Sequence, residues 1–393
     1  MIKLNFSNIS TTLQVFCIVT MMSTVGIVAA QHNHDNHASG DRISSKGMAV
    51  MDSKAVFVPF EFTRRAVGDD DVLIEILYAG ICHSDIHQVL SDWKNETYPM
   101  VPGHEIVGRI AKVGRRVTRF RVGDYAGVGC MVNSCGQCGY CRDDKEQHCE
   151  IGTVYTYASK DIYHNNEITY GGYSNNIVVP AKFVIKIPSN APLEKIAPLF
   201  CAGITTYSPI KYAGVKKNDR VAIAGFGGLG HMALQYLVKR GAKVTVFDIT
   251  DDKEKEALTM GATKYINIKN IKEPEKLKDS FRFIFSTIPA KYDPTIYVKM
   301  LEDGGELIIL GVPPTKDTPQ VDIATLVFLS RRKVWGSVIG GIRETQEMLD
   351  YSVKNKIYPR VELIEPSQIT ETYKKITNNS GRFRYVIDMR KLK

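Results

Sequence analysis

The sequence predicts a two-domain α/β protein, a β-barrel-like unit followed by a doubly wound parallel sheet, on three observations. At 393 residues the chain is longer than one ordinary hydrophobic core supports. Residues 46–200 contain short apolar or alternating runs broken by Gly and Pro, which is typical of a barrel of short strands. From about Tyr207 onward, apolar strands alternate with segments of helical periodicity, which indicates a parallel sheet.

The first thirty residues have the layout of a secretory signal peptide. Lys3 precedes a mostly apolar run from Leu13 to Val28, and Ala30 ends a small-residue cleavage pattern before Gln31. The run is interrupted by polar residues and is short for a membrane span, so a single membrane anchor is the less favoured alternative. We therefore expect cleavage after Ala30 and export to the periplasm or the medium, without membrane attachment afterwards. A cytoplasmic location is the alternative.

Residues 31–45 are expected to form a polar linker. It carries His32, His34 and His37. Such a tract can hold a metal loosely, but a solvated tail is the simpler interpretation. Lys46 to Val50 is predicted to be the first strand, which places the start of the folded domain at residue 46.

The later elements are predicted from periodicity and turn residues. In the barrel-like unit we expect strands at residues 72–78, 105–113 and 173–179. In the second unit we expect strands at 220–224, 243–248, 281–285 and 306–310, with a helix at 229–240. A helix at 343–354 and a strand at 384–388 close the chain.

The composition is that of a soluble globular protein, with 44% hydrophobic and 24% charged residues. The net charge of +9 is diffuse, because short runs such as Lys216-Lys217 and Arg331-Arg332-Lys333 lie between acidic residues. No basic stripe with interleaved aromatic residues is present, and nucleic acid is therefore not an expected partner.

Four cysteines occupy one short segment: Cys135, Cys138, Cys141 and Cys149. Cysteines three residues apart suit a knuckle around a tetrahedral ion and suit intrachain disulfides poorly. Because all four positions around the ion would be thiolates, we expect a closed, structural zinc site. A disulfide framework is the alternative in an exported protein. Cys130, nearby, is interpreted as a buried apolar residue.

A dinucleotide fingerprint follows the predicted strand at 220–224 and opens the predicted helix. Its glycines are Gly225, Gly227, Gly228 and Gly230. Glycine at these positions allows a tight turn and lets a pyrophosphate approach backbone N–H groups at the helix N-terminus. Asp248 ends the next strand, where a carboxylate can accept both ribose hydroxyls of NAD and would repel the 2′-phosphate of NADP. The residues alone therefore favour NAD.

A second metal site is predicted from three ligands far apart in the sequence: Cys82, His104 and Cys201. Two thiolates and one imidazole leave the fourth position of a tetrahedral zinc open, which is typical of a catalytic site. His104 lies in a Gly-His-Glu turn, which alone would be weak evidence.

The residues beside these ligands suggest roles. An alcohol at an open zinc position ionises near neutral pH, and its proton needs a path outward. Ser84 is placed to accept that proton and His87 to pass it to solvent. Asp85 is suited to orient His104, and Glu105 to exchange with the water on zinc. Individually, Ser84 and Asp85 are also ordinary turn residues, and His87 an ordinary surface histidine.

These motifs, in this order, resemble the zinc-dependent medium-chain alcohol dehydrogenases. The nearest subgroup resembles the cinnamyl-alcohol dehydrogenases and the bacterial broad-range aldehyde reductases. The segments that carry the resemblance are Gly80-Ile-Cys-His-Ser-Asp-Ile-His87, Tyr98-Pro-Met-Val-Pro-Gly-His-Glu105, Val128-Gly-Cys130, Leu199-Phe-Cys-Ala-Gly-Ile-Thr-Thr-Tyr-Ser-Pro209 and the run from Gly336 to Asp350. The match extends from about Lys46 to the C-terminus.

The resemblance implies a GroES-like catalytic domain at 46–200, an inserted Rossmann domain at 201–339, and a return to the catalytic domain at 340–393. It implies a homodimer paired through the Rossmann sheets. It also implies that Thr205, Ser337 and Ile339 lie beside the nicotinamide. Trp93, and less surely Tyr98, are candidates for the substrate cleft, although both are equally plausible as core aromatics.

The implied reaction is reversible hydride transfer between NAD(P)H and aromatic or medium-chain aldehydes or primary alcohols. The subgroup usually has Ser or Thr where this chain has Asp248, and usually uses NADP, so the resemblance and Asp248 favour different cofactors. A zinc-free reductase of the same superfamily is disfavoured because both ligand sets are complete. The other alternative is an exported, non-catalytic zinc-binding protein that retains the scaffold.

Overall fold

The structure, a computed structural model, describes residues 41–94, 96–271, 274–378 and 383–392. The predicted signal peptide (1–30) and the linker as far as residue 40 lie outside the described residues. Strand β1 (Ile43–Val50) begins earlier than the expected start at residue 46. It pairs along its whole length with β2 (Phe57–Arg64), and the buried Ser45 hydroxyl donates to Asn176 Oδ1 at 2.7 Å. The end of the expected linker, from Ile43, thus belongs to the folded domain.

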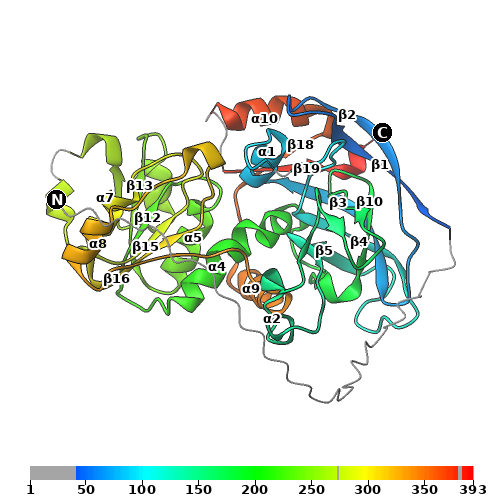
Figure 1. Cartoon of the computed structure of the whole chain (residues 1–393), viewed down its shortest axis with the longest axis horizontal. Helices are drawn as coiled ribbons and strands as arrows, with labels where there is room; N and C mark the ends of the chain where they lie inside the picture. Colours follow the sequence, from blue (N-terminus) through cyan, green and yellow to red (C-terminus); the bar gives the residue numbers. More distant parts are fainter. Residues whose placement is uncertain (1–40, 95, 272–273, 379–382, 393) are drawn as a thin grey trace, which may run out of the picture. The chain divides into compact units, whose positions relative to one another are not determined.

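The first domain is built on a seven-stranded sheet in which β3 is central (Figure 1). The order is β11-β5-β4-β3-β19-β18, and β10 also pairs with β3. The strands are β3 (Asp71–Ile81), β4 (Ile106–Val113), β5 (Tyr125–Val128), β10 (Asn176–Pro180), β11 (Ile185–Lys186), β18 (Val361–Ile364) and β19 (Arg384–Asp388). Strand β19, red in Figure 1, pairs antiparallel with the end of β3, so the C-terminal segment completes this sheet.

Short hairpins and helices decorate this sheet. The hairpin strands are β6 (Met131–Asn133) with β7 (Val154–Tyr155), and β8 (Lys160–Asp161) with β9 (Glu167–Ile168). The helices are α1 (His83–Val89), α2 (Gly139–Arg142), α3 (Leu193–Ile196) and, near the C-terminus, α10 (Ile369–Thr377). The 3₁₀ turns η1 (Glu146–His148) and η3 (Ala197–Phe200) flank the two metal-ligand regions.

The second domain is a parallel sheet of six strands in the order β14-β13-β12-β15-β16-β17. This is the doubly wound dinucleotide-binding order, with the switch point between β12 and β15. The strands are β12 (Arg220–Ala224), β13 (Lys243–Asp248), β14 (Lys264–Asn267), β15 (Phe281–Ser286), β16 (Leu301–Ile309) and β17 (Lys333–Gly336). The helices are α4 (Ala202–Tyr212), α5 (Gly230–Lys239), α6 (Glu254–Thr259), α7 (Pro294–Met300) and α8 (Ile323–Leu329). Helix α9 (Ile342–Asn355) follows this domain and packs against both α4 and the first domain.

Buried apolar side chains form three core clusters among the described residues. One core cluster fills the barrel around Ile74, Ile106 and Tyr173. A second cluster lies against one face of the parallel sheet. The largest cluster extends from α5 through α4 and α9 to Phe200 of the barrel. Helix α4, which follows Cys201, therefore packs into a core that both domains share. The predicted fold class, a β-barrel domain with a Rossmann domain, is confirmed.

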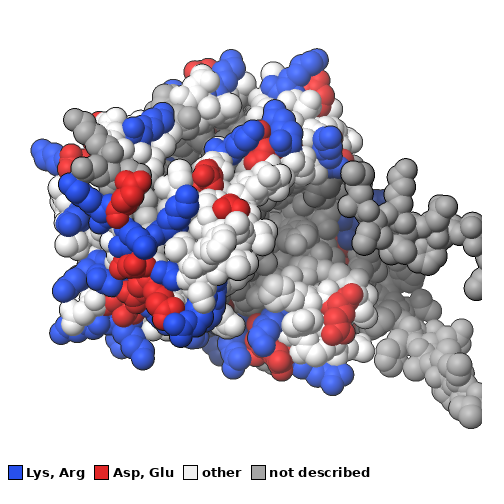
Figure 2. All heavy atoms as spheres, turned by 60° about the vertical axis from the view of Figure 1, so that its left-hand side comes forward, with Lys and Arg blue, Asp and Glu red and all other residues white. Residues whose placement is uncertain are grey.

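The described surface agrees with a diffuse charge. In Figure 2, basic and acidic side chains are intermixed on the face shown, without a stripe of one sign. In the part of the chain that the structure describes, no helix combines the length and the apolar character needed to cross a membrane.

Candidate active site

Four potential metal ligands meet in the interior of the molecule: Cys82, His104, Glu105 and Cys201. One ligand atom from each lies within 4.8 Å of the others, and all four residues are buried. The Sγ atoms of Cys82 and Cys201 are 3.7 Å apart, although the residues are 119 positions apart in the sequence. The fold thus brings together the three ligands predicted for the open site.

Local structure explains how each ligand reaches this place. Cys82 follows the end of β3 and caps the N-terminus of α1. His104 and Glu105 precede β4, which pairs with β3, and Cys201 lies between η3 and α4. Gly80 allows the close approach of these segments, because a Cβ there would collide with the Glu105 carboxylate.

Asp85 is the centre of the hydrogen bonds that orient the ligands. Its carboxylate accepts from the backbone N–H of Cys82 at 2.9 Å and contacts His104 Nδ1 at 2.9 Å. Because Nδ1 faces Asp85, the lone pair of His104 Nε2 is free for a metal, as is usual for metal-bound histidine. The hydroxyl of Tyr173 also donates to Asp85, at 3.3 Å, and lies 3.2 Å from the hydroxyl of Tyr373. The role predicted for Asp85 is consistent with this geometry.

Glu105 forms a buried ion pair with Arg384 that the sequence did not predict. Arg384, in the last strand, is 4% exposed and donates to Glu105 Oε1. Burial raises the pKa of Glu105 to about 7 even though Arg384 opposes the shift. Glu105 Oε2 is buried, has no hydrogen-bond partner among the described residues, and faces a cluster of metal ligands. The sequence signal for Arg384 was a single cation at the start of a strand whose next three residues, Tyr385 to Ile387, carry no charge.

Ser84 and His87 occupy the first two turns of α1. Their spacing of three residues places both on one side of the helix. His87 Nδ1 contacts Asp92 Oδ2 at 2.7 Å, so its Nε2 is left as an acceptor, and Nε2 has no partner among the described residues. Asp92 is the second functional residue that sequence reasoning missed. Burial, with nearby His87, lowers the pKa of His83 to about 4.

Trp93 lies beside this dyad and touches the cofactor domain. Its ring centroid is 5.3 Å from that of His87, and its Nε1 donates to the carbonyl of Pro313 at 3.3 Å. Thr315 donates to the carbonyl of Asp92 from both its N–H and its hydroxyl, each at 3.1 Å. Tyr98 instead donates its hydroxyl to Val89 O at 2.7 Å and packs against the barrel core. The structure therefore places Trp93, rather than Tyr98, next to the reactive residues.

The residues fit zinc on two grounds. With Zn–S bonds of about 2.3 Å, two thiolates of a tetrahedral ion lie about 3.8 Å apart. The Cys82–Cys201 separation of 3.7 Å matches this spacing. The donor set of two sulfurs and one imidazole is the set that zinc prefers when one position stays open.

The glycine fingerprint forms the expected cradle between β12 and α5. Gly225 has a positive φ of 93°, and a Cβ at Gly230 would collide with the Gly225 carbonyl. Gly227 has open space where a Cβ would lie, so backbone N–H groups at the start of α5 are accessible to an anion. Arg384 packs against Gly228, and its buried Nε has no partner in the part of the chain that the structure describes. These features fit the pyrophosphate of a dinucleotide.

Asp248 lies at the end of β13 beside the fingerprint. Its Oδ2 accepts from the N–H of Phe226 at 2.9 Å and its Oδ1 from the N–H of Ile249 at 2.6 Å. The ammonium of Lys253 lies 3.2 Å from Oδ2. Asp248 therefore stands where the adenosine ribose of a dinucleotide would lie, with a partly exposed cation next to it.

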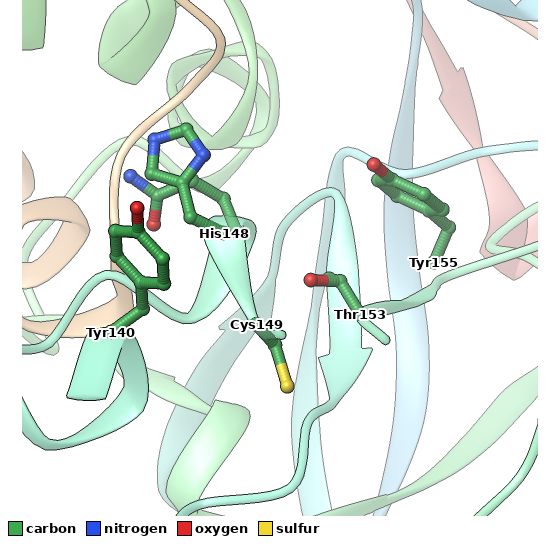
Figure 3. A pocket seen from close by; sticks show the side chains of 6 residues that line it. Tyr140, His148, Cys149, Thr153 and Tyr155 are labelled. Atoms are coloured by element: carbon green, nitrogen blue, oxygen red, sulfur yellow. The ribbon is translucent and has the colours of Figure 1, made fainter. Parts of the chain in front are cut away.

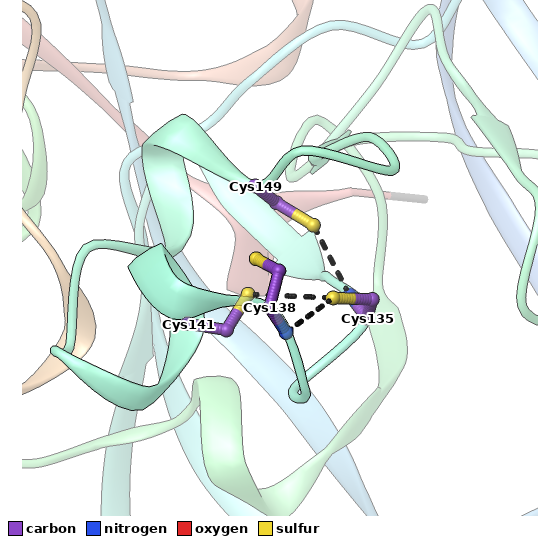
Figure 4. Close-up of side chains that lie close together, drawn as sticks. All are labelled: Cys135, Cys138, Cys141 and Cys149. Atoms are coloured by element: carbon purple, nitrogen blue, oxygen red, sulfur yellow. Dashed lines mark hydrogen bonds between the residues drawn. The ribbon is translucent and has the colours of Figure 1, made fainter.

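The four predicted thiols of the second site also converge (Figure 4). Cys135 Sγ and Cys141 Sγ are 3.8 Å apart, the spacing of two ligands on one zinc rather than of a disulfide. Backbone N–H groups point at the sulfurs of Cys135 and Cys149, at 3.3–3.4 Å. Although burial opposes it, the backbone N–H groups of Cys135 and Gly152 lower the pKa of Cys149 to about 6. All seven described cysteines are free, including Cys130.

A separate hollow of about 550 Å³ lies beside this four-thiol loop (Figure 3). Tyr140 and His148 form part of its wall, with ring centroids 5.8 Å apart. None of the residues that line it belongs to the Cys82–His104–Cys201 cluster. It therefore does not hold the reaction centre.

The remaining predicted residues lie along the joint between the domains. Thr205 is buried in the first turn of α4, and its N–H donates to the carbonyl of Cys201 at 2.9 Å. Ser337 and Ile339 follow the end of β17, and the N–H of Ser337 donates to Ile309 O. A Cβ at Gly340 would lie 2.8 Å from Ile204 Cδ1, so this loop packs beside the turn that holds Thr205.

Two family models match the chain and define its class. Residues 68–189 match the alcohol dehydrogenase GroES-like domain, and residues 228–354 match the zinc-binding dehydrogenase domain. The protein is thus a zinc-binding dehydrogenase with an alcohol dehydrogenase GroES-like domain.

Similar proteins narrow this assignment. The probable formaldehyde dehydrogenase of Bacillus subtilis is 44% identical over 342 residues, 87% of this chain and 97% of that protein. Cinnamyl alcohol dehydrogenase 8 of Arabidopsis thaliana is 40% identical over 87% of this chain and 94% of its own. The crystal structure of CAD from Helicobacter pylori, complexed with NADP(H), has a TM-score of 0.86 and 50% identity over 89% of this chain and 99% of its own. The chain belongs to the zinc-dependent medium-chain alcohol dehydrogenases, in the cinnamyl-alcohol-dehydrogenase-like subgroup, and catalyses alcohol–aldehyde redox chemistry.

Proposed function

We propose that the protein interconverts primary alcohols and aldehydes, with aromatic and medium-chain aldehydes as the substrate class. The observation that carries the proposal is the convergence of three ligands, Cys82, His104 and Cys201, in a fold that also holds a dinucleotide cradle and a histidine whose Nε2 has no partner among the described residues. The names of the Arabidopsis and Bacillus relatives support the same class. Trp93, whose ring flanks His87, offers an apolar wall suited to an aromatic substrate.

The chain's own residues supply binding and proton transfer. When bound, zinc supplies Lewis acidity toward the substrate oxygen and the nicotinamide accepts or donates the hydride. Ser84 Oγ takes the hydroxyl proton of the alcohol and His87 Nε2 takes it onward. Asp92 holds the proton on His87 Nδ1, which keeps Nε2 ready as the acceptor. Asp85 fixes the orientation of His104.

We also propose two zinc ions per subunit, one in the cluster of Cys82, His104 and Cys201 and one in the four-thiol loop. Both sets have their donor atoms within 4.8 Å of one another. The first set leaves a position for substrate, with Glu105 beside it. The second consists of four thiols and leaves none, so its role is to hold the loop.

For the cofactor we propose a preference for NAD(H). The Asp248 carboxylate would repel a 2′-phosphate, at a cost on the order of 1–4 kcal/mol for like charges about 4 Å apart. Lys253, at 3.2 Å, partly neutralises this carboxylate and leaves NADP(H) usable. Replacing Asp248→Ser should shift the ratio of kcat/KM values toward NADP(H) by about tenfold or more. A wild-type protein already faster with NADPH than with NADH would contradict the preference.

We propose that the protein is a homodimer paired at the edge strand β17 of the parallel sheet. The adjacent helix α8 exposes Ile323 (68%), Val327 (69%) and Phe328 (86%), and Val338 after β17 is 51% exposed. An apolar patch next to an unpaired sheet edge suits a second copy of the chain. Light scattering of wild-type protein and of Phe328→Glu tests this, with a dimer expected for the former and a monomer for the latter.

The N-terminal residues support a further proposal, that residues 1–30 direct export and are removed. Its test is the N-terminal mass of the protein in fractionated cells. A mature chain that begins at Gln31 in the exported fraction is expected. A full-length chain confined to the cytoplasm would contradict it.

The central test is an assay of mature protein with benzyl alcohol and benzaldehyde and a panel of medium-chain aldehydes, with both cofactors side by side. We expect turnover with zinc at two equivalents per chain. The absence of turnover with either cofactor at full zinc occupancy would favour the alternative, a non-catalytic zinc-binding protein on the retained scaffold.

A further inference from the structure

The loop from Ser337 to Gly340 is held in an unfavourable backbone conformation. Ile339 is buried and has a φ of +35°, which a β-branched side chain rarely adopts. Such a conformation persists only where the surrounding structure imposes it. Because this is the loop assigned to the nicotinamide side of the cofactor site, what holds it also shapes that site.

The loop is fixed at its far end by the start of helix α9. A Cβ at Gly340 would lie 2.7 Å from the carboxylate of Glu344 and 2.8 Å from Ile204. A Cβ at Gly341 would collide with the carbonyl oxygen of Asp144, in the four-thiol loop. The N-terminus of α9 thus packs directly against the segment between Cys141 and Cys149.

Glu146 makes the buried polar contact at this joint, beside the more exposed ion pair of Arg343 with Asp144 at 2.9 Å. It is 1% exposed, and its Oε2 accepts from the N–H of Ile342 at 3.1 Å. The residue before the helix, Gly341, has no side chain with which to cap it. A carboxylate from a segment distant in sequence therefore caps α9, where the positive end of the helix dipole favours an anion. Lys182, 3.9 Å from Oε1, is the cation that accompanies this buried charge.

Glu146 in turn belongs to the four-thiol loop. It lies three residues before Cys149, and its carbonyl accepts from the hydroxyl of Thr153 at 2.7 Å. The other end of the connection is α4, since Glu344 and Glu347 of α9 accept from Ser208 at 2.8 Å and Tyr207 at 2.9 Å. Helix α4 begins at the metal ligand Cys201 and carries Thr205. A shift of α9 would therefore move both the Ser337–Gly340 loop and the turn of α4 that carries Thr205, the two segments assigned to the nicotinamide site.

We propose that Glu146 is a positioning residue, through which the four-thiol loop holds the N-terminus of α9 and so keeps the Ser337–Gly340 loop in its cofactor-binding conformation. The four-thiol loop then acts on cofactor affinity although none of its residues touches the reaction centre. This goes beyond the proposed function and rests on it only in assigning that loop to the nicotinamide.

The test replaces Glu146→Ala and Glu146→Gln in the full-length protein and measures cofactor binding directly. Quenching of protein fluorescence by the reduced cofactor gives Kd without turnover, and steady-state kinetics give KM and kcat. For Glu146→Ala we expect Kd and KM for the cofactor to rise about tenfold, the size of a lost helix cap, with kcat and the KM for alcohol within twofold. Glu146→Gln should recover most of this, because its amide oxygen can still accept from Ile342.

Matched variants separate positioning from simple destabilisation. Glu150→Ala removes an exposed glutamate from the same loop and should leave the cofactor Kd unchanged. Gly341→Ala places a methyl group against the carbonyl of Asp144 and so separates α9 from the four-thiol loop. It should raise the cofactor Kd as Glu146→Ala does. In both Glu146→Ala and Gly341→Ala, backbone hydrogen exchange should accelerate at residues 337–343, while the zinc content stays at the wild-type value.

A Glu146→Ala protein with wild-type cofactor Kd, or one that only melts at a lower temperature, would overturn the proposal. So would a Glu146→Gln protein as impaired as the alanine variant. Failure of the proposed function is distinguishable, because wild-type protein would then show no binding of either cofactor, and this too would overturn the role of Glu146.

Discussion

The two thiol-rich sites of this protein have similar donor spacing and opposite construction. In the four-thiol loop, Cys135 and Cys149 are 14 positions apart, and backbone N–H groups of the loop itself point at the sulfurs. In the reaction centre, Cys82 and Cys201 are 119 positions apart, and Asp85 and Arg384 contact His104 and Glu105 from 19 and 279 positions away. One site is made by a loop, and the other is made by the whole fold.

This difference teaches what each site can do. A loop can fold around an ion on its own, so metal binding there contributes directly to folding. A site assembled from β3, the turn before β4 and the start of α4 exists only in the native protein, where burial excludes water and surrounding groups can tune the ligands. The assembled site can therefore catalyse a reaction, whereas the local site can only hold its loop in place.

The largest effect is expected from breaking the assembled site. Cys201→Ser removes a thiolate ligand, and the loss of Lewis-acid catalysis should lower kcat by roughly 10³-fold or more. Zinc measured on purified protein should fall from two equivalents to one, with little change in circular dichroism. Cys138→Ser is the matched control, since its thiol belongs to the four-thiol loop and not to this cluster, and it should keep most of its activity. Full activity of the Cys201 variant would refute the assignment.

The next effect concerns proton transfer beside the same site. His87→Ala removes the acceptor Nε2, and kcat should fall by roughly 10²-fold, the usual contribution of a positioned acid or base. The remaining rate should increase with buffer concentration, because buffer then carries the proton. His148→Ala, on the exposed four-thiol loop, provides the control. A variant at position 87 with an unchanged rate and no buffer dependence would exclude the relay.

A matched pair of hydroxyl deletions compares the supporting groups of the two sites. Tyr173→Phe removes a donor to Asp85, and Tyr163→Phe removes a hydroxyl 3.7 Å from Cys149 Sγ. Each should weaken zinc binding about tenfold at its own site only, as losses of outer hydrogen bonds do. Competition with a chromogenic chelator measures both. Loss of metal at the opposite site would show that the two sites are not independent.

The smallest effect on the chemical step is expected from breaking the local site. Cys138→Ser should lower Tm by about 5–10 °C, since the loop loses metal-derived stability. At 25 °C its kcat should stay within about twofold of wild type, because no thiol of the loop reaches the substrate. The cofactor KM should rise as for Glu146→Ala. A kcat as low as that of Cys201→Ser would contradict the division of roles.

Much of the fold was predictable because its signals are local. The bounds of β12, β13 and β19 coincide with the predicted strands, since apolar runs ended by charged or glycine residues define them. The four-thiol loop and the glycine fingerprint were visible for the same reason. The start of β1 at Ile43 was not, because polar Ser44 and Ser45 conceal a strand that a buried hydrogen bond to Asn176 secures.

The missed site residues have partners that spacing does not reveal. Arg384 and Glu105 are 279 positions apart, and only the sheet order places them together. Asp92 is near His87 in sequence, but its carboxylate returns to the ring through a turn with positive φ at Ser91. Glu146 looked like one more acidic residue of a polar loop, and only its contact with α9 reveals a role.

The place of β19 has a consequence for how the protein is made. This strand is the last one among the described residues. It inserts between β3 and β18 and carries the guanidinium that touches both Gly228 and Glu105. During translation, therefore, every thiol and the whole glycine cradle leave the ribosome before the sheet beneath the reaction centre can close. A transcript cut short before codon 384 would yield a product with both sets of metal ligands that still lacks a finished enzyme.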